Sequence, residues 1–198
     1  MRIATGKSAL CRPGSRDSTE KESGMFGLGQ VYQTGFVVAD MNAALDRWTA
    51  CGVGPFFLRT LALGGSMDGS PVNFTARIAL GFSDDMQIEL IQVVGGDGSP
   101  YPAPPRGEAQ YLHHLAFQTQ DVRGETDRLV RRGMRVHYEL NVAGGDYAYL
   151  AFEPGGGSGL VELLPVRSES TRRDSIYKEA AANWQGEDPV RTPQGEQA

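Results

Sequence analysis

Two glutamates sit in the middle of short apolar runs. Glu89 lies in Gln-Ile-Glu-Leu-Ile at 87–91, and Glu162 lies in Leu-Val-Glu-Leu-Leu at 160–164. A carboxylate is rarely buried unless it is paired or binds a metal ion. Strand side chains alternate between two faces, so each glutamate points away from its apolar neighbours. Two such carboxylates in matching strands indicate a polar site built by an internal repeat.

The repeat is visible at a constant offset. Segment 33–40 (QTGFVVAD) aligns with segment 114–121 (HLAFQTQD), an offset of 114 − 33 = 81. The same offset pairs Asp46-Arg47 with Asp127-Arg128, and Gly52 with Gly133. The glutamates pair at 162 − 89 = 73, so the second copy is about eight residues shorter. Both copies share the order strand, aspartate, amphipathic helix, glycine, strands and a final glutamate strand.

Gln33 and His114 occupy the same position in the first strand of the two copies. If the copies pack with pseudo-twofold symmetry, these two residues line one concave surface together with Glu89 and Glu162. One imidazole nitrogen, one amide oxygen and two carboxylate oxygens suit one divalent ion, such as Zn²⁺, Ni²⁺, Co²⁺ or Mn²⁺. The two carboxylates neutralise the ion's charge, which would explain why buried glutamates are tolerated.

The elements that must position these residues form two tandem βαβββ modules. We predict an α+β fold in which the modules, related by pseudo-twofold symmetry, build a curved mixed sheet around a metal cavity. Asp40 and Asp121 are expected to cap the helix of each module. The predicted boundaries are a flexible N-terminal tail 1–27, a first module 28–94, a linker 95–109, a second module 110–166 and a C-terminal tail 167–198.

The C-terminal tail is predicted to hold one short helix over 175–184, followed by a loose end. Ile176 and Trp184 are expected to dock that helix on the core.

Composition excludes several classes of protein. The 198 residues carry a net charge of −5, which argues against sequence-independent binding to nucleic acid. No apolar run approaches the roughly 18 residues that span a bilayer, so we expect no membrane insertion. Cys11 and Cys51 have no metal or redox spacing, and a cytoplasmic location is the default expectation.

The chain resembles the vicinal oxygen chelate superfamily, which contains glyoxalase I, methylmalonyl-CoA epimerase, extradiol dioxygenases and bleomycin-resistance proteins. The resemblance covers about residues 29–166 and is carried by segments 33–40 (QTGFVVAD), 52–56 (GVGPF), 88–91 (IELI), 113–117 (HHLAF) and 161–163 (VEL). It implies Gln33, Glu89, His114 and Glu162 as metal ligands, in the order of eukaryotic-type glyoxalase I. The epimerases have His, Gln, His and Glu, so this chain departs from them at the first two positions.

The resemblance also implies a reaction. A glyoxalase-like or epimerase-like lyase or isomerase moves a proton next to a carbonyl through a metal-stabilised enediolate. Glu162 is then the principal base and Glu89, opposite it, the second acid–base group. The substrate would be a small molecule with vicinal oxygens or an acidic α-proton, and a homodimer is expected.

Two other functions share this fold. A binding protein that sequesters a small molecule has no need of a complete ligand set, so the four aligned residues favour an enzyme. A metal-dependent dioxygenase uses two histidines and one carboxylate. Strand alternation predicts that His113 faces away from His114, and His137 has no matching place, which disfavours that chemistry.

Overall fold

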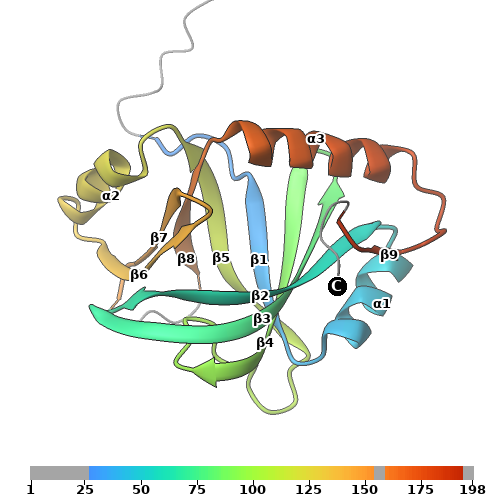
Figure 1. The fold of residues 1–198 in the computed structure, drawn as a ribbon, viewed down its shortest axis with the longest axis horizontal. Helices are drawn as coiled ribbons and strands as arrows, with labels where there is room; N and C mark the ends of the chain where they lie inside the picture. The colour runs from blue at the N-terminus through green and yellow to red at the C-terminus, as the bar shows by residue number, and fades with distance from the viewer. Residues whose placement is uncertain (1–26, 154–158, 194–198) are drawn as a thin grey trace, which may run out of the picture.

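The computed structural model describes residues 27–153 and 159–193, and it confirms the two tandem βαβββ modules (Figure 1). The first module consists of β1 (Gln33–Val38), α1 (Met41–Ala50), β2 (Phe56–Met67), β3 (Ser70–Ser83) and β4 (Met86–Asp97). The second consists of β5 (Gln110–Thr119), α2 (Val122–Val130), β6 (Arg135–Val142), β7 (Gly145–Ala151) and β8 (Leu160–Pro165). The predicted α+β class and module order therefore hold.

The strands form one mixed sheet that closes on itself. Across the described residues the strand order is β3-β4-β1-β5-β8-β7-β6-β2, and β2 also pairs with β3. At the centre, β1 and β5 are antiparallel, while each is parallel to the last strand of its own module. Ser66 and Met67 of β2 pair with Glu139 and Tyr138 of β6, which closes the ring. The predicted curved sheet is thus bent into a barrel.

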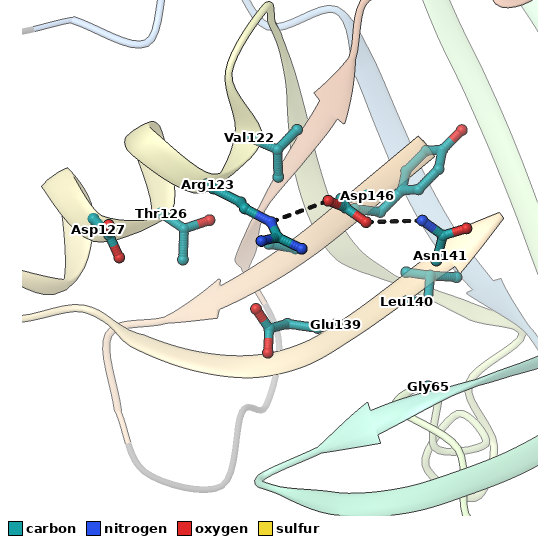
Figure 2. A pocket seen from close by; sticks show the side chains of 11 residues that line it. Gly65, Val122, Arg123, Thr126, Asp127, Glu139, Leu140, Asn141 and Asp146 are labelled. Carbon is teal, nitrogen blue, oxygen red and sulfur yellow. Dashed lines mark hydrogen bonds and ion pairs between the residues drawn. The ribbon is translucent and has the colours of Figure 1, made fainter. Parts of the chain in front are cut away.

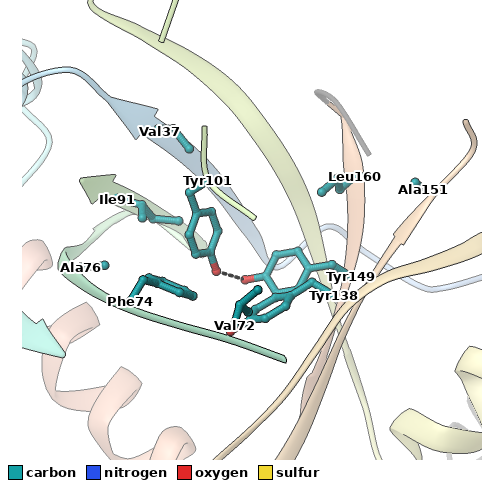
Figure 3. Close-up of a cluster of buried hydrophobic side chains, with 10 residues drawn as sticks. All are labelled: Val37, Val72, Phe74, Ala76, Ile91, Tyr101, Tyr138, Tyr149, Ala151 and Leu160. Carbon is teal, nitrogen blue, oxygen red and sulfur yellow. Dashed lines mark hydrogen bonds between the residues drawn. The ribbon is translucent and has the colours of Figure 1, made fainter. Parts of the chain in front are cut away.

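Strand alternation separates an outer from an inner face. Val38 packs outward into a cluster with Met41 and Leu45 of α1, and on the other module Leu163 packs with Leu129 of α2. The inner face carries a separate apolar cluster, drawn in Figure 3, to which β1, β4 and β8 contribute Val37, Ile91 and Leu160. Residues two apart share a face, so Gln33, Glu89 and Glu162 point into the barrel.

Aromatic rings fill much of the barrel interior. Tyr101, Tyr138 and Tyr149 are all at most 4% exposed, and the hydroxyls of Tyr101 and Tyr149 lie 2.8 Å apart (Figure 3). Tyr101 belongs to segment 95–109, in which the sequence shows no periodicity. That segment joins the modules and also packs a side chain into the core.

Both helix caps are formed as predicted. The carboxylate oxygens of Asp40 and Asp121 accept hydrogen bonds from the backbone N–H groups of Ala43 and Gly124, at 2.8 Å and 2.9 Å. Each bond satisfies one of the free donors at a helix start.

The C-terminal helix is longer than predicted. α3 (Ser168–Ala182) begins seven residues before the expected start at Ser175 and lies across one end of the barrel (Figure 1). Tyr177 docks it, stacking on Phe57 at 3.6 Å between ring centroids, whereas Ile176 is 52% exposed and does not dock. Trp184 follows the helix and lies beside Gly54.

The segment after α3 is not loose throughout. β9 (Val190–Arg191) pairs in parallel with Phe56 and Phe57 of β2. Local apolar periodicity could not reveal this strand, because its partner lies more than 130 residues away in the chain. The N-terminal tail up to residue 26 and the last residues 194–198 lie outside the described part. No helix among the described residues is both long and apolar enough to cross a membrane.

Candidate metal centre

The register of the central strands brings the four predicted site residues to one place. Gly35 of β1 pairs with Glu89 on one side and with His114 on the other. Its repeat counterpart Ala116 pairs with Gln33 and with Glu162 in the same way. Each glutamate therefore faces the ligand candidate of the other module across a small residue.

The side chains converge on His114 Nε2. This atom lies 3.0 Å from Glu162 Oε2, 3.4 Å from Glu89 Oε2 and 3.4 Å from Gln33 Oε1. Candidate ligand atoms of Glu89, His114 and Glu162 all lie within 4.8 Å of one another, a spacing that can hold a metal ion.

The donor and acceptor balance of this cluster fits a cation. One imidazole N–H cannot satisfy three oxygen acceptors. Glu162 Oε2 is buried and makes no aligned hydrogen bond in the described structure, although it lies 3.0 Å from His114 Nε2. A divalent ion at the centre would satisfy that orphaned oxygen and the other inward-facing lone pairs together.

Gly35 makes room for the His114 ring. A Cβ placed on Gly35 would overlap the imidazole, with Cε1, Nε2 and Nδ1 as its nearest atoms. The ring therefore lies directly against the β1 backbone. Glycine inside a strand is unfavourable in general and often marks such a close approach.

His113 does not face away from His114, and the sequence-based prediction on this point is wrong. The β1–β5 register shifts between Gly35, which pairs with His114, and Phe36, which pairs with Leu112. His113 is the extra residue of a β-bulge, and a bulge breaks the regular alternation of side chains. Both histidines are fully buried, with their Nδ1 atoms 3.1 Å apart.

The bulge fixes which nitrogen of His114 is available. His113 Nε2 lies 2.8 Å from the Pro100 carbonyl oxygen, which can only accept, so this nitrogen carries a hydrogen. Burial and the nearby charge of His114 lower the pKa of His113 to about 3, so its ring is neutral and its Nδ1 accepts. His114 Nδ1 must then donate. Its Nε2 is left as the metal-binding atom.

A second chain of hydrogen bonds orients Gln33. Gln87 donates its amide N–H to Asp174 Oδ1 of α3 at 3.2 Å, because a carboxylate only accepts. The oxygen of Gln87 then accepts from Gln33 Nε2 at 2.7 Å, which turns Gln33 Oε1 toward His114. Asp174 is itself held by Tyr32 at 2.6 Å and by Arg173 at 2.8 Å.

The carboxylates and burial shift the pKa values in the cluster. Burial alone would lower the pKa of His114, but Glu162 and Glu89 outweigh it and raise this pKa to about 9. Burial raises the pKa of Glu89, against the opposing effect of His114. Without metal, His114 is an imidazolium between carboxylates. A metal ion must displace its Nε2 proton to bind.

Access to the cluster is asymmetric. The Glu89 side chain is 13% exposed, whereas those of Glu162 and His114 are 4% and 0% exposed. Tyr149 pairs with Glu162 across β7 and β8, and burial together with the charge of Glu162 keeps the pKa of Tyr149 well above its usual value. Glu89 is thus the member of the cluster nearest to solvent.

Sequence reasoning missed the residues that support the four. Gly35 and Gln87 carried a readable signal, since one is a glycine within a strand and the other shares a face with Glu89. Pro100, His113 and Asp174 carried none, because their roles depend on a bulge, a linker and a distant helix.

A separate cavity of about 540 Å³ lies on the outside of the barrel, between α2 and the β6–β7 hairpin (Figure 2). Asp146 there accepts from Asn141 at 2.8 Å and pairs with Arg123 at 3.2 Å. Asp146 thus neutralises the positive charge of the Arg123 side chain in this cavity. None of the four candidate ligands lines the cavity.

The chain belongs to the Glyoxalase/Bleomycin resistance protein/Dioxygenase superfamily, whose family model matches residues 32–152. This confirms the resemblance seen in the sequence. The matched segment contains Gln33, Glu89 and His114 and ends before Glu162. No curated protein sequence matches the chain.

Solved structures are similar to this chain at low sequence identity. A hypothetical protein from Bacillus halodurans is 16% identical, with a TM-score of 0.47 over 70% of this chain and 95% of that one. Methylmalonyl-CoA epimerase from Mycobacterium tuberculosis is 18% identical, with a TM-score of 0.46 over 70% and 89% of the two chains. A glyoxalase I variant from Zea mays is 14% identical, with a TM-score of 0.41 over 69% and 43%.

Proposed function

We propose that this protein is a metal-dependent isomerase or lyase of the glyoxalase type, which moves a proton on a carbon next to a carbonyl. One observation carries the proposal. Oxygens from Gln33, Glu89 and Glu162 converge on a single histidine nitrogen inside the barrel, and one of them, Glu162 Oε2, makes no aligned hydrogen bond with any described residue.

Gln33, Glu89, His114 and Glu162 would hold one divalent ion, such as Zn²⁺, Ni²⁺, Co²⁺ or Mn²⁺. Bound there, the ion would act as a Lewis acid and stabilise negative charge on the substrate oxygen beside the reacting carbon. The protein's part is to fix the ligands through His113 and Gln87, and to keep His114 and Glu162 buried away from bulk water.

The two glutamates divide the proton transfer. Glu162 would be the principal base once its carboxylate is released from the ion, since its Oε2, 3.0 Å from His114 Nε2, makes no aligned hydrogen bond with a described residue. Glu89, whose pKa is raised by burial, returns a proton as the second acid–base group. Different environments for two carboxylates are a usual way to separate an acid from a base.

The test combines metal analysis with proton exchange. Purified protein is expected to hold one divalent ion per chain, and to exchange the α-hydrogen of an α-hydroxyketone or an acyl-CoA thioester for deuterium. Glu162→Gln should abolish exchange, while Glu139→Gln, which changes an exposed glutamate of β6, should leave it intact.

Two outcomes would redirect the assignment. Protein without stoichiometric metal, whose ligand binding is unchanged by Glu162→Gln, would be a sequestering protein. Oxygen consumption with an iron-loaded site would indicate a dioxygenase. The structure disfavours the latter, because both nitrogens of His113 are engaged, one by Pro100 and one by His114. The homodimer and the cytoplasmic location stay predictions.

A further inference from the structure

A groove of about 500 Å³ runs between α3 and the paired strands β2 and β9. Its lining residues include Phe57 and Arg59 of β2, Arg172 and Tyr177 of α3, and Arg191 of β9. The volume lies within the roughly 300–1,000 Å³ of small-molecule sites. Most of the lining residues follow residue 152, where the family match ends, so the groove lies largely outside the matched segment.

The groove concentrates positive charge on a protein of net charge −5. Four arginines line it, against the single carboxylate of Glu169, which pairs with Arg167 at 3.0 Å. Arg173 is engaged by Asp174. Arg191 donates from Nε to the Asp188 carbonyl oxygen at 3.2 Å, and its Nη2 lies 3.9 Å from Glu187, at the limit of an ion pair.

Arg172 is exposed and makes no hydrogen bond or ion pair with any described residue. The cavity in Figure 2 differs, because Asp146 neutralises its Arg123 at 3.2 Å. The groove therefore retains cationic hydrogen-bond donors that face a concave surface.

An apolar wall lies beside these cations. The rings of Phe57 and Tyr177 stack with an interplanar angle of 3°, and Ile176 is exposed at the same groove. A simple inorganic anion would leave this wall in contact with water. A ligand that carries both an anionic group and an apolar or planar part would use both features.

We propose that the groove between α3 and β2–β9 binds a small organic anion, with its phosphate or carboxylate on Arg172 and Arg191 and its apolar part against Phe57, Tyr177 and Ile176. Guanidinium groups suit this role because they present paired N–H donors to such oxygens. The site goes beyond the proposed metal chemistry and does not depend on it.

The experiment is a calorimetric titration of the full chain with three probes: phenyl phosphate, benzoate and inorganic phosphate. EDTA and constant ionic strength remove contributions from metal-bound phosphate and from general screening. At least one of the two aromatic anions is expected to bind more tightly than inorganic phosphate. Comparison of phenyl phosphate with benzoate identifies which anionic group the groove takes.

Variants locate the binding. Arg172→Gln and Arg191→Gln should each weaken the aromatic anion about tenfold, since each removes charged hydrogen bonds. Arg135→Gln removes an exposed arginine of β6 far from the groove and should change nothing. Binding of none of the probes, or equal binding by wild type and both groove variants, would overturn the proposal. Metal content and deuterium exchange are measured on the same variants, so failure here is distinguishable from failure of the metal site.

Discussion

His114 in the second module is held from the linker, whereas Gln33 in the first module is held from the C-terminal helix. Both residues occupy the same repeat position, on adjacent central strands. On one side the Pro100 carbonyl orients His113, which orients His114. On the other side the Asp174 carboxylate orients Gln87, which orients Gln33.

The two chains of hydrogen bonds follow the same physical rule with different atoms. Each begins at a group that can only accept, so the direction of every following hydrogen bond is fixed. One chain ends at His114 Nε2 and the other at Gln33 Oε1, and these two atoms lie 3.4 Å apart. The repeat therefore supplies equivalent backbone positions, and segments outside the repeat decide the chemistry presented there.

Substitutions at the repeat-equivalent residues Gly35 and Ala116 are expected to show the largest difference between the two modules in their effect on metal binding. Gly35→Val should abolish metal binding, because the new side chain would occupy the space of the His114 ring and force it out of the site. Ala116→Gly keeps the ligands in place and should lower the free energy of unfolding by only about 1 kcal/mol. Calorimetric metal titration and thermal melts check both. Metal binding by Gly35→Val at wild-type affinity would contradict the site geometry.

The hydrogen bonds that run from Pro100 through His113 to His114 are expected to have the next largest effect on metal affinity. His113→Leu removes the acceptor for His114 Nδ1 and leaves the Pro100 carbonyl unpaired, so metal affinity should fall about 10–100-fold. His137→Leu is the matched control, since His137 is also buried in the barrel wall but contacts Asp68 instead. A metal titration of the two variants gives the comparison. Equal losses would mean that His113 acts only through packing.

The hydrogen bonds that run from Asp174 through Gln87 to Gln33 should contribute less to metal affinity. Asp174→Asn replaces an obligate acceptor by a group that can also donate, so Gln87 and Gln33 can turn and present N–H to the site. We expect metal affinity to fall about tenfold or less, because a neutral amide oxygen is the weakest of the four ligands. Tyr32→Phe removes one bond to Asp174 without changing the direction of the chain, and should keep the affinity.

The smallest expected effect is a pH dependence of folding stability. It comes from His114 in the second module and has no counterpart at Gln33 in the first. The folded-state pKa of His114, about 9, lies above its ordinary value of 6.5. The stability this provides is fully present below pH 6.5 and is lost as pH rises toward 9, because the unfolded chain releases the proton first.

Metal-free protein should therefore melt at progressively lower temperature across this interval, by about 2–4 °C for each kcal/mol lost. His114→Gln gives both modules the same amide and should flatten that part of the pH profile. Gln33→Leu should preserve it. A profile that is unchanged in His114→Gln would assign the titration to another group.

The repeat and the alternation of apolar residues were sufficient to predict the modules and the inward direction of Glu89 and Glu162. Asp40 and Asp121 were identified as helix caps because capping is a contact within four residues. His113 was placed on the wrong face, since a single-residue bulge reverses alternation without a marker in composition. The extent of α3 was underestimated because its polar sequence shows little apolar periodicity.

The sequence by itself determined the four candidate ligands and the order of the elements that carry them, because strand period and repeat offset act locally along the chain. Only the tertiary structure decided what orients those ligands. Asp174 meets Gln87 across 87 residues, and Pro100 meets His113 across 13, through contacts that exist only once the barrel has closed. Hydrogen-bond direction is a property of such assembled contacts, so it could not be assigned from residue types alone.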